Sequence, residues 1–270
     1  MAEPTTAPIR MSEMAGGVAR DVYARNPLIL LPMGSHEDQG PHAPMGDYLC
    51  ADEVAVRIAR RARDLGVETY VAPVVPFGGA DYFAPMPGGI ALEQATLKAV
   101  LADMFNCLMN HGLTRLIVIN GHGGNVQALH DVTLDVRRRS GVLIPSMYLW
   151  KVGYGLLPGI LGAENAAKAA GHGCDPLSSV FMHLFPDLVR HDLVPGPQTP
   201  VKVMGLDPFT FGSLRFEGAE IHAPIEYDTI APLGVKGDPR LCSPETGAAL
   251  VERLTEIGAS FAQYYVQNAR

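Results

Sequence analysis

The stretch that decides the fold reads LILLPMGSHEDQGPHAPMGDY and covers residues 28–48. It opens with a continuous apolar run closed by Gly34 and Ser35, which is typical of a strand buried on both faces of a sheet. Directly after this run come two histidines, two aspartates, a glutamate and a glutamine. The sequence therefore predicts a buried strand whose carboxyl end opens into a cluster of side chains able to bind a metal ion.

The same pattern of an apolar run followed by an amphipathic segment repeats along the first half of the chain. Strands are expected at 26–35, 67–78, 114–125 and 142–150, and helices at 48–66, 91–112 and 126–141. This alternation predicts an α/β fold, with a mostly parallel central sheet and helices on both faces. Right-handed crossovers would bring every strand-to-helix turn to one edge of that sheet, where ligands bind in open α/β sheets.

The second half of the chain is less regular. Residues 166–189 are expected to form a loop that runs into a helix, and residues 243–265 a closing helix with Ser243 as its N-cap. Between them, residues 190–240 are rich in proline and glycine, which predicts an arm, a lid or a subunit contact. No repeat or long linker divides the chain, so residues 1–270 are predicted to form a single domain.

Composition argues against several classes of protein. The net charge of -7 gives no basic surface for nucleic acid, and no apolar run approaches the ~18 residues of a membrane span. The first residues lack the apolar stretch of a signal peptide. Charge and hydropathy thus predict neither nucleic-acid nor membrane partners. The cysteines are scattered, which in a chain without a signal peptide is typical of reduced thiols and predicts a cytoplasmic protein. They are Cys50, Cys107, Cys174 and Cys242.

Three residues at the predicted strand ends form the first candidate metal site. Glu37 and Asp47 follow the first strand, and His122 lies in NGHGGN, residues 120–125, after the third. One imidazole and two carboxylates suit Zn²⁺, Mn²⁺ or Fe²⁺, and Asp47 could bridge two ions. Two alternatives remain open for the glycine-rich loop: a tight turn with a solvent-facing histidine, or a phosphate cradle at the start of the next helix.

A second polar cluster lies in HGCDPLSS, residues 172–179. His172, flanked by glycines, is a candidate general acid or base. Asp175 is a candidate ligand, a partner of His172, or the N-cap of the next helix. Tyr82 and Trp150 are candidates for lining a substrate pocket that suits a flat ring, although a lone tryptophan is more often a packing residue.

These motifs resemble those of the creatininase (creatinine amidohydrolase) family, in consistent order from about Leu28 to Tyr265. The resemblance is carried by GSHEDQGPHAP at 34–44, PGGIAL at 87–92, NGHGGN at 120–125, HGCDPLSS at 172–179 and GVKGDPRLCSPETG at 234–247. It implies a creatininase-like three-layer architecture and a metal-dependent hydrolase that opens cyclic amides or cleaves other nonpeptide C–N bonds. It also implies a paired metal site and a homo-oligomer, commonly a hexamer.

The resemblance assigns roles to individual residues as well. Glu37 and His122 match ligands of one ion, and Asp47 matches the bridging carboxylate if one residue is deleted before it. His172 matches the catalytic histidine. Trp150 falls where creatininase has a tryptophan that gates the substrate.

The chain is a divergent member by this comparison, because it departs from the family at the second metal position. Gln39 stands where the family has a histidine ligand, and a neutral amide oxygen binds Zn²⁺ much more weakly than imidazole does. Gly124 stands where creatininase has a glutamate ligand, and Leu177 stands where other members have a glutamate. The remaining candidates for a second site are Gln39, His42, Asp175 and His36.

Three functions follow, in order of support. The first is a metal-dependent hydrolase of a small cyclic amide or another nonpeptide C–N bond, acting on a small-molecule substrate through metal-activated water. The second keeps the hydrolase but changes the substrate to a formamide, a lactone or a sugar-derived ring. The third is a metal-poor binding or scaffold protein that has lost turnover.

Overall fold

A parallel sheet with the strand order β2–β1–β3–β4 forms the centre of the fold. The computed structural model describes residues 8–80, 82–198, 201–210 and 212–269. The strands are β1 (Leu28–Met33), β2 (Thr69–Val71), β3 (Leu116–Asn120) and β4 (Ser146–Tyr148). In the register of the sheet, Leu30 of β1 lies opposite Val71 on one side and Ile117 on the other. The predicted parallel sheet is therefore confirmed.

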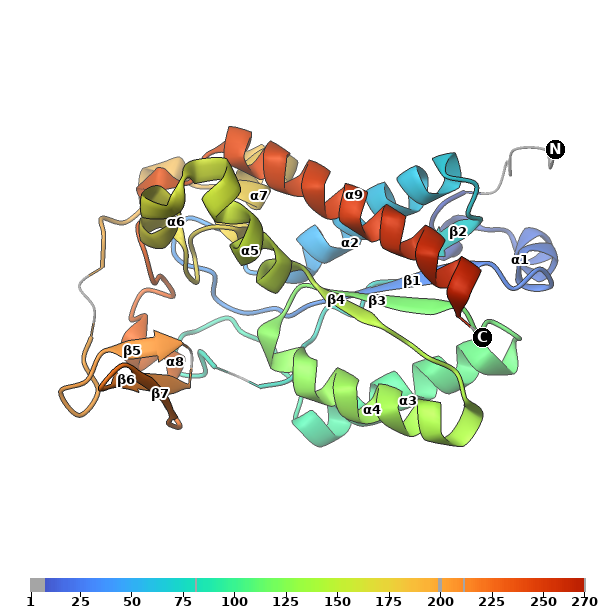
Figure 1. Ribbon diagram of the computed structural model, residues 1–270, viewed down its shortest axis with the longest axis horizontal. Helices are drawn as coiled ribbons and strands as arrows, with labels where there is room; N and C mark the ends of the chain where they lie inside the picture. Colours follow the sequence, from blue (N-terminus) through green and yellow to red (C-terminus); the bar gives the residue numbers. More distant parts are fainter. Residues whose placement is uncertain (1–7, 81, 199–200, 211, 270) are drawn as a thin grey trace.

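Helices cover both faces of this sheet (Figure 1). One face carries α2 (Asp47–Asp64), α7 (Leu177–Leu184) and α9 (Pro244–Asn268), and the other carries α1 (Gly16–Tyr23), α3 (Gln94–Asn110) and α4 (Val126–Ser140). Because successive side chains of a strand point to opposite faces, β1 contributes to two cores. Leu28 and Leu30 pack into the first core, and Ile29 and Leu31 pack into the second. This arrangement confirms the predicted three-layer α/β fold.

The chain beyond β4 differs from the prediction. The sequence predicts a strand through Trp150, but β4 ends at Tyr148 and α5 (Leu149–Leu161) begins at once. Trp150 therefore lies in the first turn of a helix, where it is buried. A continuous apolar run hides this change of period, because periodicity alone does not separate a buried strand from a buried helix. The helix α6 (Ala163–Ala169) follows before α7.

The region predicted as an irregular arm contains a small antiparallel sheet. Its strands, in the order β5–β6–β7, are β5 (Pro208–Thr210), β6 (Ser213–Phe216) and β7 (Ala219–His222), and the short helix α8 (Tyr227–Ile230) follows. Most of these side chains are exposed or half-buried, so the strands lack a continuous apolar run. Polar and apolar residues do alternate in Ser213–Phe216 and in Ala219–His222, on either side of a turn at Glu217 and Gly218, and the predicted irregular arm misses this short hairpin signal. Figure 1 shows this sheet beyond the carboxyl ends of β1 and β3. Residues 199–200 and 211 of the predicted arm lie outside the described residues.

Smaller features complete the fold. Ser243 caps α9 as predicted, because its hydroxyl oxygen accepts a hydrogen bond from the backbone N–H of Thr246 at 3.1 Å. Single-turn 3-10 helices are η1 (Met11–Glu13), η2 (Gly123–Asn125), η3 (Pro186–Leu188), η4 (His191–Leu193) and η5 (Pro239–Leu241). Over the described residues, no helix combines the length and the apolarity that a bilayer crossing requires. Residues 1–7, which bear on the predicted lack of a signal peptide, lie outside this part of the chain.

Candidate functional site

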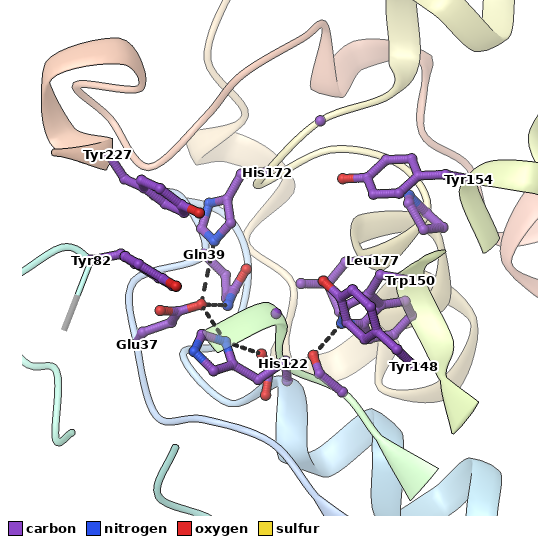
Figure 2. A pocket seen from close by; sticks show the side chains of 15 residues that line it. Glu37, Gln39, Tyr82, His122, Tyr148, Trp150, Tyr154, His172, Leu177 and Tyr227 are labelled. Atoms are coloured by element: carbon purple, nitrogen blue, oxygen red, sulfur yellow. Dashed lines mark hydrogen bonds and ion pairs between the residues drawn. The ribbon is translucent and has the colours of Figure 1, made fainter. Parts of the chain in front are cut away.

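A cavity opens where the chain leaves the carboxyl ends of β1, β3 and β4 (Figure 2). Segments that are distant in the sequence meet there, as the carboxyl edge of a parallel sheet requires. Its lining includes most of the residues that the sequence marks as candidates, namely Glu37, Gln39, Asp47, Tyr82, His122, Trp150 and His172. The structure thus brings the two predicted polar clusters together in one site.

Glu37, Asp47 and His122 form the tightest cluster of this cavity. Each offers one ligand atom within 4.8 Å of the others, and all three residues are buried. His122 Nδ1 lies 3.1 Å from Glu37 Oε1 and 3.3 Å from Asp47 Oδ2. An imidazole nitrogen between two carboxylates is a donor set that suits Zn²⁺, Mn²⁺ or Fe²⁺. In the described part of the chain, no other group of acidic, histidine and cysteine side chains lies this close together.

Asp47 is held in place by the turn that follows β1. It is the first residue of α2, where the helix dipole favours a negative charge. The backbone N–H of Ser35 donates to Asp47 Oδ1 at 2.5 Å, and the Ser35 hydroxyl donates to Oδ2 at 2.9 Å. Gly34 permits this close approach, because a Cβ at that position would lie 2.2 Å from Asp47 Oδ1. Gly34 and Ser35 therefore position a carboxylate of the cluster.

The loop at residues 120–125 orients the His122 ring. The Asn120 side-chain oxygen accepts from the backbone N–H of His122 at 3.0 Å and from Asn125 Nδ2 at 3.1 Å, so the loop is tied to itself. His122 Nε2 lies 3.3 Å from the carbonyl oxygen of Gly79. A proton on Nε2 that is donated to this carbonyl leaves the lone pair of Nδ1 facing the carboxylates. Metal-binding histidines are commonly held in one tautomer by such an outer hydrogen bond.

His172 enters the cavity from the loop before α7. Its Nδ1 lies 2.6 Å from the carbonyl oxygen of Gly234, so Nδ1–H donates there and Nε2 faces the cluster. Nε2 lies 3.5 Å from Glu37 Oε1. The Phe83 ring packs against the imidazole, with ring centroids 4.5 Å apart. A histidine oriented in this way can exchange a proton at Nε2 with a molecule bound in the cavity.

The two carboxylates of the cluster favour a positive charge between them. Burial opposes a charged imidazole, but the charge of Glu37 and hydrogen bonds with Asp47 and Glu37 raise the pKa of His122 well above its usual value. Burial works to raise the pKa of Glu37, yet His122 and His172 lower that pKa overall. At Asp47 burial dominates and raises the pKa, although His122 offsets part of the effect. A proton on His122 therefore occupies the position that a divalent cation would take.

Binding of a divalent ion is expected to weaken as the pH falls. The ion needs the Nδ1 lone pair of His122, and the raised pKa lets a proton hold this position above the ~6.5 usual for imidazole. Below the raised pKa one proton must leave per ion bound, so affinity should fall about tenfold per pH unit and level off at higher pH. Chelator competition across pH measures this slope. An affinity that stays constant down to the usual imidazole pKa would contradict His122 as a ligand.

The structure does not place Asp175 and His42 in the cavity wall. Asp175 is fully buried, and burial raises the pKa of its carboxyl group. It is not the helix cap that the sequence allows, because the N-cap of α7 is Pro176 and Asp175 lies one residue before it. His42 is also buried, with Nε2 3.3 Å from Ser178 Oγ.

Trp150 is both a core residue and part of the cavity wall. It packs among the residues that α2, α7 and α9 bury on one face of the sheet. Its indole N–H donates to the carbonyl oxygen of Gly121, directly before His122. The packing and pocket interpretations of Trp150 are therefore compatible with each other.

Tyrosines that the sequence does not mark as candidates also line the cavity, namely Tyr148, Tyr154 and Tyr227. Tyr227 of α8 stacks on Tyr82, with ring centroids 4.1 Å apart and ring planes 9° apart. Figure 2 shows this pair on one side of the cavity, with Trp150, Tyr148 and Tyr154 on the other. Tyr154 stands one helical turn after Trp150, a spacing that links them only once α5 is recognised. No sequence pattern points to Tyr227.

Comparison with known proteins identifies relatives of this chain. The family model described as Creatininase, creatinine amidohydrolase, matches residues 12–261. A creatinine amidohydrolase from Pseudomonas putida is 30% identical over 209 residues, which cover 69% of this chain and 77% of the relative. A mycofactocin precursor peptide peptidase from Mycolicibacterium smegmatis is 26% identical over 241 residues, which cover 87% of this chain and 84% of the relative.

Solved creatininase structures share the fold. A Mn form, and a Zn–Zn form of a creatininase variant, each align with a TM-score of 0.73 at 21% identity. The alignments cover 97% and 98% of this chain, respectively, and 99% of each neighbour. At 21% identity these structures show a shared fold only. The family itself is shown by the family model, which matches residues 12–261. The chain belongs to the creatininase family of amidohydrolases.

Proposed function

We propose that this enzyme is a metal-dependent hydrolase that cleaves the C–N bond of a small cyclic amide or another nonpeptide amide. The observation that carries the proposal is the cluster of Glu37, Asp47 and His122, with His172 beside it in one cavity. The donor set fits a divalent ion, because two charged oxygen donors flank an imidazole nitrogen that points between them. Zn²⁺, Mn²⁺ and Fe²⁺ are all compatible with such donors.

The residues of the cavity have separable tasks in this reaction. Glu37, Asp47 and His122 would hold the ion. When bound, the ion would supply Lewis acidity and make a water molecule acidic enough to react near neutral pH. His172 would take up a proton at Nε2 and return it to the leaving nitrogen, because Gly234 fixes the opposite side of its ring.

Tyr82 and Tyr227 would restrict bulk water at the reacting group. Their rings stack on each other, and the Tyr82 ring centroid lies 6.0 Å from that of His122. Exclusion of water strengthens the electrostatic interactions inside a site. The aromatic walls also suit a flat substrate, whether a lactam or one of the alternative ring substrates.

A peptide-like substrate is the second candidate. It is supported by the likeness to a mycofactocin precursor peptide peptidase, which aligns over most of this chain. Tyrosines on both sides of the cavity could bind an aromatic residue next to the bond that is cut. Both candidates require the same ion and the same proton carrier, so they differ in the substrate alone.

A substrate panel tests the proposal. The metal-loaded enzyme is incubated with lactams, formamides, short peptides containing aromatic residues and lactones matched to the lactams, and released amines and acids are measured. We expect turnover of at least one amide class, its loss on chelation and its return with added ion. Turnover of lactones alone would show that the enzyme cleaves esters and not C–N bonds. Turnover that survives complete removal of the ion would refute the metal-dependent function.

A further inference from the structure

We propose that this centre holds a single metal ion, and that the Gln39 amide occupies the place where a second ion would need a charged ligand. The inference rests on the proposed function, because it concerns the number of ions in the same centre. It departs from the paired site that the family resemblance implies. Three features of the cavity carry it: the number of charged donors, the direction of the Gln39 amide, and the neighbouring positions that offer no ligand.

The cavity wall offers charged donors for one ion. Among the described residues that line it, only Glu37, Asp47, His122 and His172 carry a carboxylate or an imidazole. A Zn²⁺-type ion takes about three or four protein ligands, so two ions that share one carboxylate would need about five donors or more. The first three of these residues already converge on one point. His172 by itself would not complete a second site.

Gln39 presents a donor, not an acceptor, to the cluster. The residue is only 1% exposed, and its Nε2 donates to Glu37 Oε1 at 3.1 Å. The reversed amide would put two acceptor oxygens in contact, so hydrogen bonding decides the orientation. An amide N–H carries partial positive charge and does not coordinate a cation. Gln39 therefore gives Glu37 a neutral hydrogen-bond donor and adds no charged ligand to the cluster.

The other end of the same amide is a buried acceptor. Gln39 Oε1 has no hydrogen-bond partner within the described residues. Figure 2 shows the amide projecting into the cavity, with its oxygen directed away from Glu37. A buried acceptor without a partner is destabilising, and an N–H group of a bound amide would satisfy it. This oxygen is also the atom of Gln39 that could contact a second ion, so a variant that removes it tests whether Gln39 is a ligand.

The neighbouring positions do not supply the missing charge. Leu177 lines the cavity with an apolar side chain. At Gly124, a Cβ would fall 2.4 Å from the carbonyl oxygen of Gly79 and 2.6 Å from His122 Nε2, so a ligating side chain does not fit there. His42 is buried next to Ser178 and does not line the cavity. Among the described residues that line the cavity, no further charged group therefore stands in for a second set of ligands.

The number of ions per chain tests the proposal. The full-length protein is saturated with Mn²⁺, freed of unbound ion by gel filtration, and measured by elemental analysis and electron paramagnetic resonance. We expect one ion per chain and the spectrum of an isolated Mn²⁺. Gln39→Met keeps the size of the side chain but removes its polar atoms, and it should leave the ratio unchanged. Glu37→Gln should lower the ratio well below one.

Two outcomes overturn the proposal, and they are distinguishable. A ratio of two with a spin-coupled spectrum shows a paired centre, and a fall to one in Gln39→Met would then identify Gln39 as a ligand; the hydrolase function would stand. A ratio near zero for Mn²⁺, Zn²⁺ and Fe²⁺ removes the single ion and the metal-dependent function together. The wild-type ratio decides the matter even if a variant fails to fold.

Discussion

Glu37→Gln is expected to release the metal ion and to lower kcat/KM at least about a hundredfold. Glu37 Oε1 lies 3.1 Å from His122 Nδ1, 3.1 Å from Gln39 Nε2 and 3.5 Å from His172 Nε2, so it lies between the proposed ligand set and the proposed proton carrier. The glutamine keeps the shape of the side chain but removes one of the two negative charges that favour a cation there. A neutral amide oxygen is a weaker ligand than a carboxylate.

Metal content and initial rates, measured on the same preparations, test this expectation. Glu164→Gln is the matched control, because the Glu164 side chain is 84% exposed on α6 and pairs only with Lys168 among the described residues. The control should keep both the ion and the rate. A Glu37→Gln enzyme with normal metal content and normal turnover would remove Glu37 from the centre. Loss of turnover with the ion retained would instead assign Glu37 to proton transfer.

The central layers of the fold are predictable from the sequence because burial leaves a pattern. Residues Leu28–Met33 of β1 are all buried, and the run is apolar for that reason. The helices α2, α3 and α4 each bury one stripe, which gives the helical spacing. The strands β5 to β7 bury few side chains, so they lack the apolar run that marks β1, and their signal is only a short alternation of polar and apolar residues around the turn at Glu217 and Gly218.

The site is predictable as far as the sheet topology determines it. Glu37 and His122 follow neighbouring parallel strands, so their convergence follows from the strand order. The stacking of Tyr227 on Tyr82 joins segments that no strand pairing connects, and short-range patterns carry no information about it. The direction of the Gln39 amide cannot be predicted from the sequence either, because it is set by the hydrogen bond from its Nε2 to Glu37 Oε1. Contacts between segments that are not paired in the sheet are thus the part of the site that only the structure shows.

His172→Ala is expected to lower kcat about 10²–10⁴-fold while leaving the metal content unchanged. The ring is fixed by the Gly234 carbonyl at Nδ1 and by the Phe83 ring, so Nε2 is directed at the cavity. Its 3.5 Å distance to Glu37 Oε1 places it beside the ligand set, while Glu37, Asp47 and His122 converge without it. Removing the imidazole should therefore remove the proton carrier and not the ion.

His130→Ala is the matched control, because His130 is an exposed histidine of α4 and should tolerate the change in rate and metal content alike. Chemical rescue gives a readout that a structural defect would not reproduce. Added imidazole should restore part of the rate by entering the space left beside Glu37. If metal content fell in step with the rate, His172 would be a ligand. If kcat were unchanged, the leaving nitrogen would receive its proton from another group.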